Sequence, residues 1–206
     1  MSPIETLTFA ELLDELAAKT PAPGGGAVAA AVGALAGALG GMVISYSVGK
    51  KSLAEHKPEL ELAANRLLAA RGLLLALAKE DSEAFGLLSE LRRLPEGDPR
   101  RIREEPAAKV TVLGAPRATM AAALDLLRLF ESLAPITNKY LHSDLAVAAV
   151  LGEATARSAW WNVHVNLSMA SDTDRPRIIR EGLASLEDAR TRRERIERAC
   201  TDGATA

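Results

Sequence analysis

One carboxylate lies where a soluble helix would normally carry an apolar side chain. Asp81 falls in a helical stretch whose residues at positions −7, −3, +4 and +7 are all apolar: Leu74, Ala78, Phe85 and Leu88. Residues at these spacings share one face of a helix, so the pattern predicts that Asp81 lies on the buried stripe. A carboxylate there must be paired, line a cavity or take a raised pKa. Such a place suits a general acid–base group; a buried Asp satisfied by Ser or backbone groups is the structural alternative.

A glycine-rich turn is the second candidate. Residues 20–26 read Thr-Pro-Ala-Pro-Gly-Gly-Gly and lead into an uncharged helix. Pro23 stiffens the approach, and Gly24, Gly25 and Gly26 let backbone N–H groups face a ligand. The start of a helix attracts anions, because its first N–H groups lack partners and its dipole is positive there. The segment therefore predicts either a cradle for an anion or polar ring, or a tight turn into a close-packed helix.

Two lysines end the uncharged stretch. Lys50 and Lys51 follow Gly49 and are the first charged residues after Lys19. Cations are favourable at a helix C-terminus, which is the simple explanation of the pair. The two lysines could instead bind a carboxylate or phosphate group of a ligand.

Polar residues gather again in the second half of the chain. Asn138, Ser143 and Asp144 lie in and after a connector, and Asn162 and Asn166 are one helical turn apart. An amide side chain offers a donor and an acceptor side by side, so it can fix a polar ring. Ser143 or Asp144 could equally cap the next helix, and the two later asparagines could tie helices together.

The chain lacks the common catalytic and metal-binding patterns. It has no Gly-x-Ser-x-Gly, no Walker loop and no His-Glu-x-x-His. Its three histidines, His56, His142 and His164, are scattered, and Cys200 is the single cysteine. We therefore expect no internal disulfide, no metal and no bound cofactor.

The uncharged stretch between residues 20 and 49 is predicted to form a helix that is buried on nearly all sides. It is long enough to cross a membrane, but it is rich in Gly and poor in Leu, Ile and Phe, so we favour a core helix. Gly33, Gly37 and Gly41 recur every four residues and share one face. Another backbone can approach closely there, which predicts tight helix packing or a subunit contact.

Helical periodicity predicts the other elements. A capping box of Thr8 and Glu11 begins a first helix, which Pro21 ends. Further helices are expected over residues 58–94, 116–133, 144–170 and from 174–176 to 200. The charged, breaker-rich segment 95–106 is expected to be a mobile surface loop. The last helix alternates basic and acidic residues, which is typical of a solvated face.

Composition narrows the function classes. The chain has 206 residues, which suggests one domain over residues 1–206 with a buried core. Aromatic residues make up only 3%, so Ala and Leu must build the core, and this favours helices. With 25 basic and 27 acidic residues, nucleic-acid binding through bulk charge is not expected. The first residues do not resemble a secretory signal, so we expect a cytoplasmic protein without a membrane partner.

Together these residues resemble the cyclodeaminase/cyclohydrolase family of folate enzymes. That family includes the C-terminal domain of formiminotransferase-cyclodeaminase and stand-alone bacterial methenyltetrahydrofolate cyclohydrolases. The matching parts are residues 9–16, 20–26, 42–43, 49–51, 137–144 and 162–167, with Asp81, Phe85, Ala115 and Pro116. One position departs from the family pattern: Thr137 stands where the family usually has Gly. The resemblance implies an all-α array of long antiparallel helices, a homodimer, and a folate site at the helices and the dimer interface.

The resemblance also implies that the substrate is a tetrahydrofolate derivative. In the cyclohydrolase reaction, water attacks the bridging carbon of 5,10-methenyltetrahydrofolate and 10-formyltetrahydrofolate results. In the cyclodeaminase reaction, a folate nitrogen attacks a formimino carbon and ammonia leaves. Both reactions need an acid–base group, and the first also needs negative charge near a cation. We expect Asp81 to be the first catalytic carboxylate and Asp144 the second, with Lys51 pairing with glutamyl carboxylates or polarising an oxygen.

The remaining candidates are expected to bind the substrate through backbone donors, amides and a cation. They are Pro23, Gly24, Gly25, Gly26, Lys50, Asn138, Ser143 and Asn166. The length leaves no room for a formiminotransferase domain, which favours a stand-alone cyclohydrolase over a cyclodeaminase. A protein of another class, a non-catalytic helical folate-binding or assembly module, would need neither Asp81 on an apolar stripe nor the Pro/Gly turn.

Overall fold

Helices are the regular secondary structure of the described residues. The computed structural model describes residues 6–204, with side chains described for residues 6–201. The six α-helices are α1 (Phe9–Ala17), α2 (Gly25–Ser45), α3 (Lys57–Leu91), α4 (Pro99–Leu133), α5 (His142–Val165) and α6 (Arg175–Ala204). Residues 6–204 contain no strand, so the all-α prediction is confirmed.

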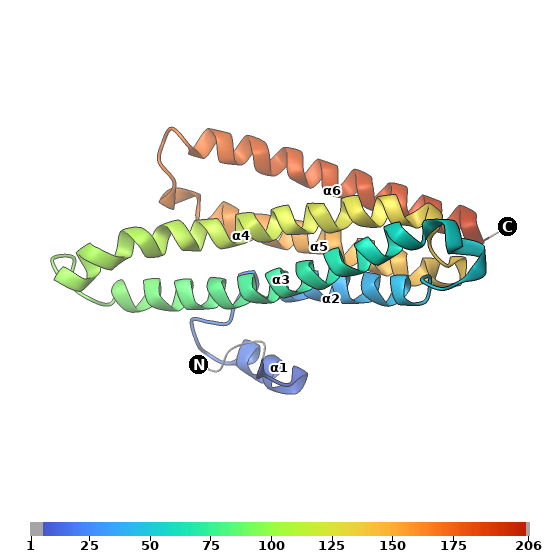
Figure 1. Cartoon of the computed structure of the whole chain (residues 1–206). Coiled ribbons are helices and arrows are strands. Elements are labelled where there is room, and N and C mark those ends of the chain that lie inside the picture. Colours follow the sequence, from blue (N-terminus) through green and yellow to red (C-terminus); the bar gives the residue numbers. More distant parts are fainter. Residues whose placement is uncertain (1–5, 205–206) are drawn as a thin grey trace.

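The uncharged helix α2 lies inside the bundle. It packs against α3 and α5 along its length and also contacts α4 (Figure 1). The core shared by α2–α6 consists mainly of Ala and Leu side chains, as the composition predicts. Its largest fully buried members include Leu67, Leu127, Phe130, Leu145 and Ile196.

Glycines let neighbouring helices approach α2 closely, but on a different spacing from the predicted one. A Cβ added at Gly33 would lie 2.9 Å from Cγ2 of Thr155, and one at Gly40 would lie 2.3 Å from Cε1 of Phe130. Gly41, which we expected on the close-packed face, has open space around its Cβ position. The contact face therefore follows a seven-residue repeat, which is close to two helical turns, rather than a four-residue one.

The charged segment after α3 is helical instead of being a mobile loop. α4 begins at Pro99, so the segment 95–106 is mostly helix, and the helix expected over residues 116–133 extends far toward the N-terminus. The Asp98 carboxylate caps α4 by accepting hydrogen bonds from the N–H groups of Arg100 (2.8 Å) and Arg101 (3.3 Å). Proline suits the first turn of a helix, where its missing N–H would have no partner anyway.

Ion pairs one turn apart support the first half of α4. Glu105 accepts from Arg101 Nε at 2.7 Å and from Lys109 Nζ at 2.8 Å. Hydrogen bonds from these two cations lower the pKa of Glu105 to about 2. These i,i+4 pairs favour helix in a segment whose prolines, Pro106 and Pro116, predict a break. The α3–α4 hairpin extends beyond the end of α2 (Figure 1).

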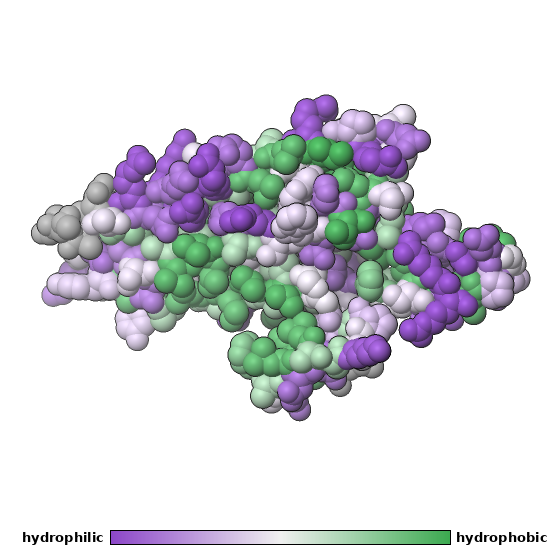
Figure 2. Space-filling view, turned by 180° about the vertical axis from the view of Figure 1, so that it is seen from behind, coloured by the Kyte–Doolittle hydropathy of each residue, from purple (hydrophilic) through white to green (hydrophobic). Residues whose placement is uncertain are grey.

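The first helix stands apart from the bundle (Figure 1). Its capping box is confirmed, because the Thr8 N–H donates to Glu11 and the Glu11 N–H donates to Thr8 Oγ1. None of its residues is buried. An apolar groove of about 190 Å³ separates α1 from α2, and residues such as Phe9, Leu16 and Val28 line it. Figure 2 shows apolar surface on the projecting helix and on the bundle beside it.

Within residues 6–204, two stretches, α2 and Pro99–Ile136, are long and apolar enough to cross a membrane by length and composition alone. Just over half of the 18-residue apolar window in each stretch is buried within the protein. This burial favours the predicted core-helix interpretation of α2.

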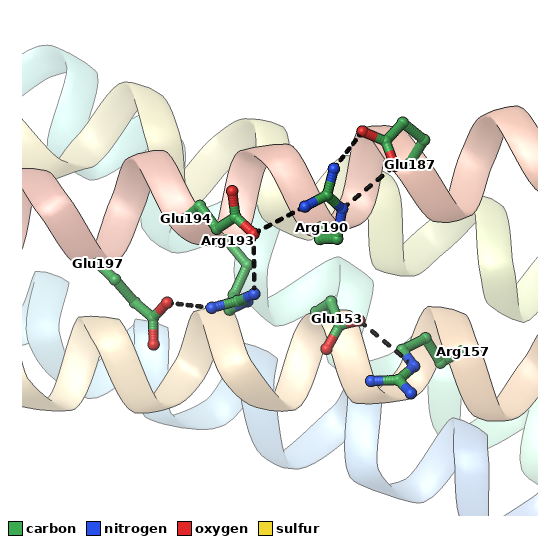
Figure 3. A network of polar contacts seen from close by, with 7 residues as sticks. All are labelled: Glu153, Arg157, Glu187, Arg190, Arg193, Glu194 and Glu197. Carbon is green, nitrogen blue, oxygen red and sulfur yellow. Dashed lines mark hydrogen bonds and ion pairs between the residues drawn. The ribbon is translucent and has the colours of Figure 1, made fainter.

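Ion pairs cover α6, in agreement with the predicted solvated face. Arg190 pairs with Glu187 and Glu194, and Arg193 pairs with Glu194 and Glu197 (Figure 3). Beneath them, α5 carries a further pair within its own helix (Figure 3). Since nearly every cation here has a nearby carboxylate, the surface offers little net charge to an ionic partner.

Candidate active site

Asp81 reaches from α3 to the N-terminus of α2. Its carboxylate accepts a hydrogen bond from the backbone N–H of Ala27. A Cβ added at Gly26 would lie 2.2 Å from Asp81 Oδ1, so only glycine leaves room for the carboxylate. The N-cap residue of α2, Gly24, makes no side-chain capping bond. Asp81 therefore supplies an acceptor to this helix end from outside the helix.

The environment of Asp81 shifts its titration toward neutral pH. Burial raises the pKa of Asp81 to about 6, and the hydrogen bond from Ala27 opposes that rise. The positive end of the α2 dipole also favours the ionised form. A carboxyl group that titrates there can both accept and return a proton during a reaction near neutral pH.

The prediction that an apolar stripe buries Asp81 is confirmed at three of the four positions and wrong at Phe85. Leu74, Ala78 and Leu88 are buried, as predicted. Phe85 is 39% exposed, so the stripe opens to solvent one turn after Asp81. Asp81 is accordingly half-buried, with apolar packing behind it and access from solvent in front.

Asn162 reaches the same helix end from α5. Gly25 lies beside Asn162 and Gly33 lies beside Thr155, so α5 runs antiparallel to α2. Asn162 Oδ1 is 3.5 Å from the Cβ position of Gly25. We call Gly25, Gly26, Asp81 and Asn162 the Asp81 cluster. The buried Pro23 and the N-cap Gly24 lead directly into it.

Asn166, which we predicted to bind substrate, lies just beyond the end of α5. Its Nδ2 donates to the carbonyl of Asn162 at 2.9 Å. Its side chain therefore closes the C-terminal end of α5, beside the Asp81 cluster.

A second polar cluster lies at the other end of α2. Lys50 Nζ donates to Asn138 Oδ1 at 2.8 Å and lies 5.1 Å from the ring centroid of Tyr140. The Asn138 N–H donates to Oγ of the buried Ser47 at 2.9 Å. We call Ser47, Lys50, Asn138 and Tyr140 the Lys50 cluster. Its members fix the Lys50 ammonium in one direction without neutralising it, because none of these three partners carries a charge.

The remaining predicted residues lie near the Lys50 cluster in the chain. Ser143 is exposed and Asp144 is half-buried, both in the first turn of α5. The N-cap of α5 is Leu141, so neither residue caps the helix. Lys51 is exposed at the start of a short 3-10 helix. The adjacent His142 is buried, and within residues 6–201 neither of its ring nitrogens has a hydrogen-bond partner.

One chain therefore divides the predicted site residues between two places. The Asp81 cluster lies at the N-terminus of α2 and the Lys50 cluster follows its C-terminus. The 21 residues of α2 make a helix of about 30 Å. Asp81 and Lys50 of the same chain cannot contact one small reacting group at that separation.

Within residues 6–201, no group of three His, Cys, Asp or Glu side chains is placed to hold a metal ion. His56 lies beside Glu55 and Glu59 at the start of α3. His164 packs against the two tryptophans near the end of α5.

Sequence reasoning missed two members of the Lys50 cluster, Ser47 and Tyr140. Both serines donate to the carbonyl four residues earlier, but Ser47 is buried and also accepts a hydrogen bond, whereas Ser45 is exposed. Nothing in the local sequence distinguishes the two serines. Tyr140 could have been suspected, because an aromatic ring two residues after Asn138 is uncommon in a chain with 3% aromatic residues.

Known proteins are similar to this chain in sequence and in fold. A sequence profile of the family described as formiminotransferase-cyclodeaminase matches residues 8–185. A methenyltetrahydrofolate cyclohydrolase from Methylorubrum extorquens is 32% identical over 80% of this chain and 81% of its own length. A formimidoyltransferase-cyclodeaminase from Mus musculus is 32% identical over 86% of this chain but only 34% of its own length, so this chain spans about a third of that relative. The solved structure of a formiminotetrahydrofolate cyclodeaminase from Thermotoga maritima superposes with a TM-score of 0.81, at 32% identity and over 98% of each chain.

Proposed function

The chain belongs to the formiminotransferase-cyclodeaminase family, and we propose that it hydrolyses 5,10-methenyltetrahydrofolate to 10-formyltetrahydrofolate. The observation that carries this proposal is the half-buried Asp81 carboxylate, whose pKa is raised to about 6 at the N-terminus of α2. A second support is the similarity over most of both chains to a relative that is named as a methenyltetrahydrofolate cyclohydrolase.

Asp81 can perform the proton transfers of this hydrolysis. The bridging carbon of the substrate belongs to a cationic amidinium, which the ionised carboxylate stabilises. Water oxygen bonds to that carbon while Asp81 takes one of the water protons. When the bond from the carbon to N5 breaks, N5 takes the proton from Asp81. The remaining hydroxyl becomes the formyl oxygen and its proton leaves to solvent, so one proton is released in each turnover. The proposal requires no cofactor.

The proposed site lies between two copies of the chain in a homodimer. The Asp81 and Lys50 clusters are about 30 Å apart along one α2, and α2 carries no charged residue. Its outer surface includes Val28, 37% exposed, and Leu35, 53% exposed, which also line the groove beside α1. A two-fold pairing with antiparallel α2 helices would bring the Asp81 cluster of one copy to the Lys50 cluster of the other.

In that arrangement the second cluster binds the far end of the substrate. Lys50 would pair with a glutamyl carboxylate, and Asn138 would hold the ammonium in place. Lys51, Ser143 and Asp144 would border the same region. A small-molecule substrate with anionic groups and a nearly neutral protein surface fit a protein that acts in the cytoplasm without nucleic acid.

The second candidate is the cyclodeaminase reaction. The structural likeness to a protein described as a formiminotetrahydrofolate cyclodeaminase favours it. The same Asp81 would remove a proton from the attacking folate nitrogen and donate a proton to the departing ammonia.

The full chain should be mixed with 5,10-methenyltetrahydrofolate and the decay of its absorbance followed against buffer alone. We expect accelerated decay, with kcat/KM rising through about pH 6 as Asp81 ionises. Ammonia release from 5-formiminotetrahydrofolate without hydrolysis of the methenyl compound would favour the second candidate. Binding of both compounds with turnover of neither would overturn the proposal and support a non-catalytic module.

A further inference from the structure

Asn162 is held in a way that leaves one atom free at the Asp81 cluster. Its Nδ2 donates to the carbonyl of Ser158 at 2.9 Å, and a carbonyl can accept only from the NH₂ side of the amide. That bond fixes the orientation of the side-chain amide, that is, which of its two atoms is Nδ2 and which is Oδ1. Both amide atoms lie beside Gly25, with Oδ1 at 3.5 Å and Nδ2 at 3.7 Å from its Cβ position. Nδ2 is engaged by Ser158, whereas within residues 6–201 no donor hydrogen-bonds Oδ1.

The hydrogen bond of Asn162 does not connect α5 to another element. Its partner, Ser158, lies one turn earlier in the same helix. Loss of the side chain therefore breaks no bond between helices, and Ala is a better helix former than Asn. An explanation of Asn162 as a hydrogen-bonded tie between helices therefore has no bond to support it within residues 6–201.

The free oxygen adds a neutral acceptor beside an ionisable one. Asp81 faces Gly26 and Asn162 faces Gly25, so the two side chains border consecutive residues of α2. A second carboxylate in the place of the Asn162 amide would raise the pKa of Asp81 further and keep Asp81 protonated near neutral pH. An amide oxygen accepts a hydrogen bond and stabilises positive charge without that effect.

We propose that Asn162 is a substrate-binding residue whose Oδ1 accepts a hydrogen bond from an N–H group of the reduced pterin ring. Asp81 meanwhile takes a proton from the water that attacks the bridging carbon. This inference rests on the proposed function of the site. Reduced pterins present N–H donors along the edge of the ring. Oδ1 of Asn162 has no donor in the described structure, so it can accept a hydrogen bond from one of these N–H groups. Asn162 thereby favours ligands with a donor at that position over ligands with an acceptor.

The test compares Asn162→Ala and Asn162→Asp with the unaltered full chain and with Ser158→Ala. Ser158 is exposed and uses only its backbone carbonyl, so Ser158→Ala is expected to keep both kcat and KM. Asn162→Ala is expected to raise KM for 5,10-methenyltetrahydrofolate about 3- to 10-fold with little change in kcat, because it removes one neutral hydrogen bond to substrate. Its melting temperature should not fall.

The pH profile of kcat/KM in Asn162→Asp is a measurement that a purely structural role of Asn162 would not change. The added carboxylate should move the acidic limb of the kcat/KM profile to higher pH, because it makes ionisation of Asp81 harder. Unchanged KM in Asn162→Ala together with an unchanged pH profile in Asn162→Asp would overturn the inference. A fall of kcat and melting temperature together, at constant KM, would also overturn it. If the unaltered chain shows no turnover, the proposed function itself is wrong.

Discussion

The properties that make Asp81 useful for proton transfer also weaken the fold. Burial penalises the ionised carboxylate, and the single hydrogen bond from Ala27 compensates only in part. Because the folded pKa of about 6 lies above the ordinary pKa of 3.8 for an aspartic acid, the folded state holds this proton more tightly than the unfolded chain does. The contribution of Asp81 to stability is therefore fully present below about pH 4 and is lost as pH rises through about 6.

Asp81→Asn is expected to abolish turnover and to stabilise the protein at pH 7. The amide oxygen can still accept from the Ala27 N–H, but the buried charge is gone. The pKa change corresponds to about 3 kcal/mol, and partial solvent exposure of Asp81 reduces the expected gain to about 1–2 kcal/mol. Urea unfolding at several pH values measures this difference, which should grow between pH 4 and 6 and then stay constant.

The alternative outcomes for Asp81→Asn are distinct. Full activity would remove Asp81 from the catalytic role. A variant less stable than the original at pH 7 would show that the ionised carboxylate stabilises the start of α2 more than its burial costs.

At the scale of elements, the start of α2 depends on a contact with α3. Gly26 leaves the space that the Asp81 carboxylate fills, and the N–H of Ala27 binds that carboxylate. One side chain therefore serves as both helix cap and proposed acid–base group. A change at the glycine should disturb the two roles together.

Gly26→Ala is expected to lower turnover about 100-fold, since its Cβ would displace the carboxylate by more than an ångström. Overpacking should also reduce the free energy of unfolding by about 1–3 kcal/mol. The matched control is Gly72→Ala in α3, whose Cβ position has no neighbour within 4 Å. That control should stabilise the protein by about 0.5–1 kcal/mol and leave turnover unchanged. Equal activity in the two variants would contradict the proposed placement of Asp81.

Local patterns predicted most helices but not how they meet. Capping residues and apolar periodicity located α1, α3 and α5 to within a few residues at each end. The first half of α4 was missed, because its prolines suggest a break while the ion pairs around Glu105 and the hairpin packing favour helix. The spacing of the close-packed glycines was also missed, since it depends on which residues of α3, α4 and α5 lie opposite.

The candidate site shows the same limit. The sequence singled out Asp81 as a carboxylate on an apolar stripe and residues 24–26 as a helix start. The contact between Asp81 and Gly26 depends on how α3 is aligned along α2, which no local pattern encodes. For the same reason the sequence could not distinguish Asn162 from Asn166, although only Asn162 directs its side chain to the α2 start.

At the scale of the whole molecule, an uncharged helix separates two polar clusters. An exposed face with Val28 and Leu35 and no charge is unusual for a surface in contact with water. The same face lies between clusters of opposite character, one built around a carboxylate and the other around an ammonium. Pairing of two such faces would bury apolar surface and join unlike clusters at the same time, which supports the homodimer in the proposed function.

A mixing experiment tests this arrangement. Asp81→Asn is expected to be inactive because it lacks the acid–base group. Lys50→Ala is expected to be nearly inactive at substrate concentrations well below its raised KM, because it lacks the cation that binds the glutamyl carboxylate. Each proposed site takes Asp81 from one copy and Lys50 from the other. In a mixed dimer, one site carries both substitutions and the other carries neither. Random pairing makes half of the dimers mixed, so a co-refolded equal mixture should recover about a quarter of the original activity.

The control for this mixture introduces a charge on the proposed interface. Leu35→Glu, placed in both variants, should yield monomers by size-exclusion chromatography with light scattering and prevent the recovery, because an unpaired carboxylate would be buried in the interface. If affinity tags show that mixed dimers form and no activity returns, then each site lies within one chain and the Lys50 cluster has another role.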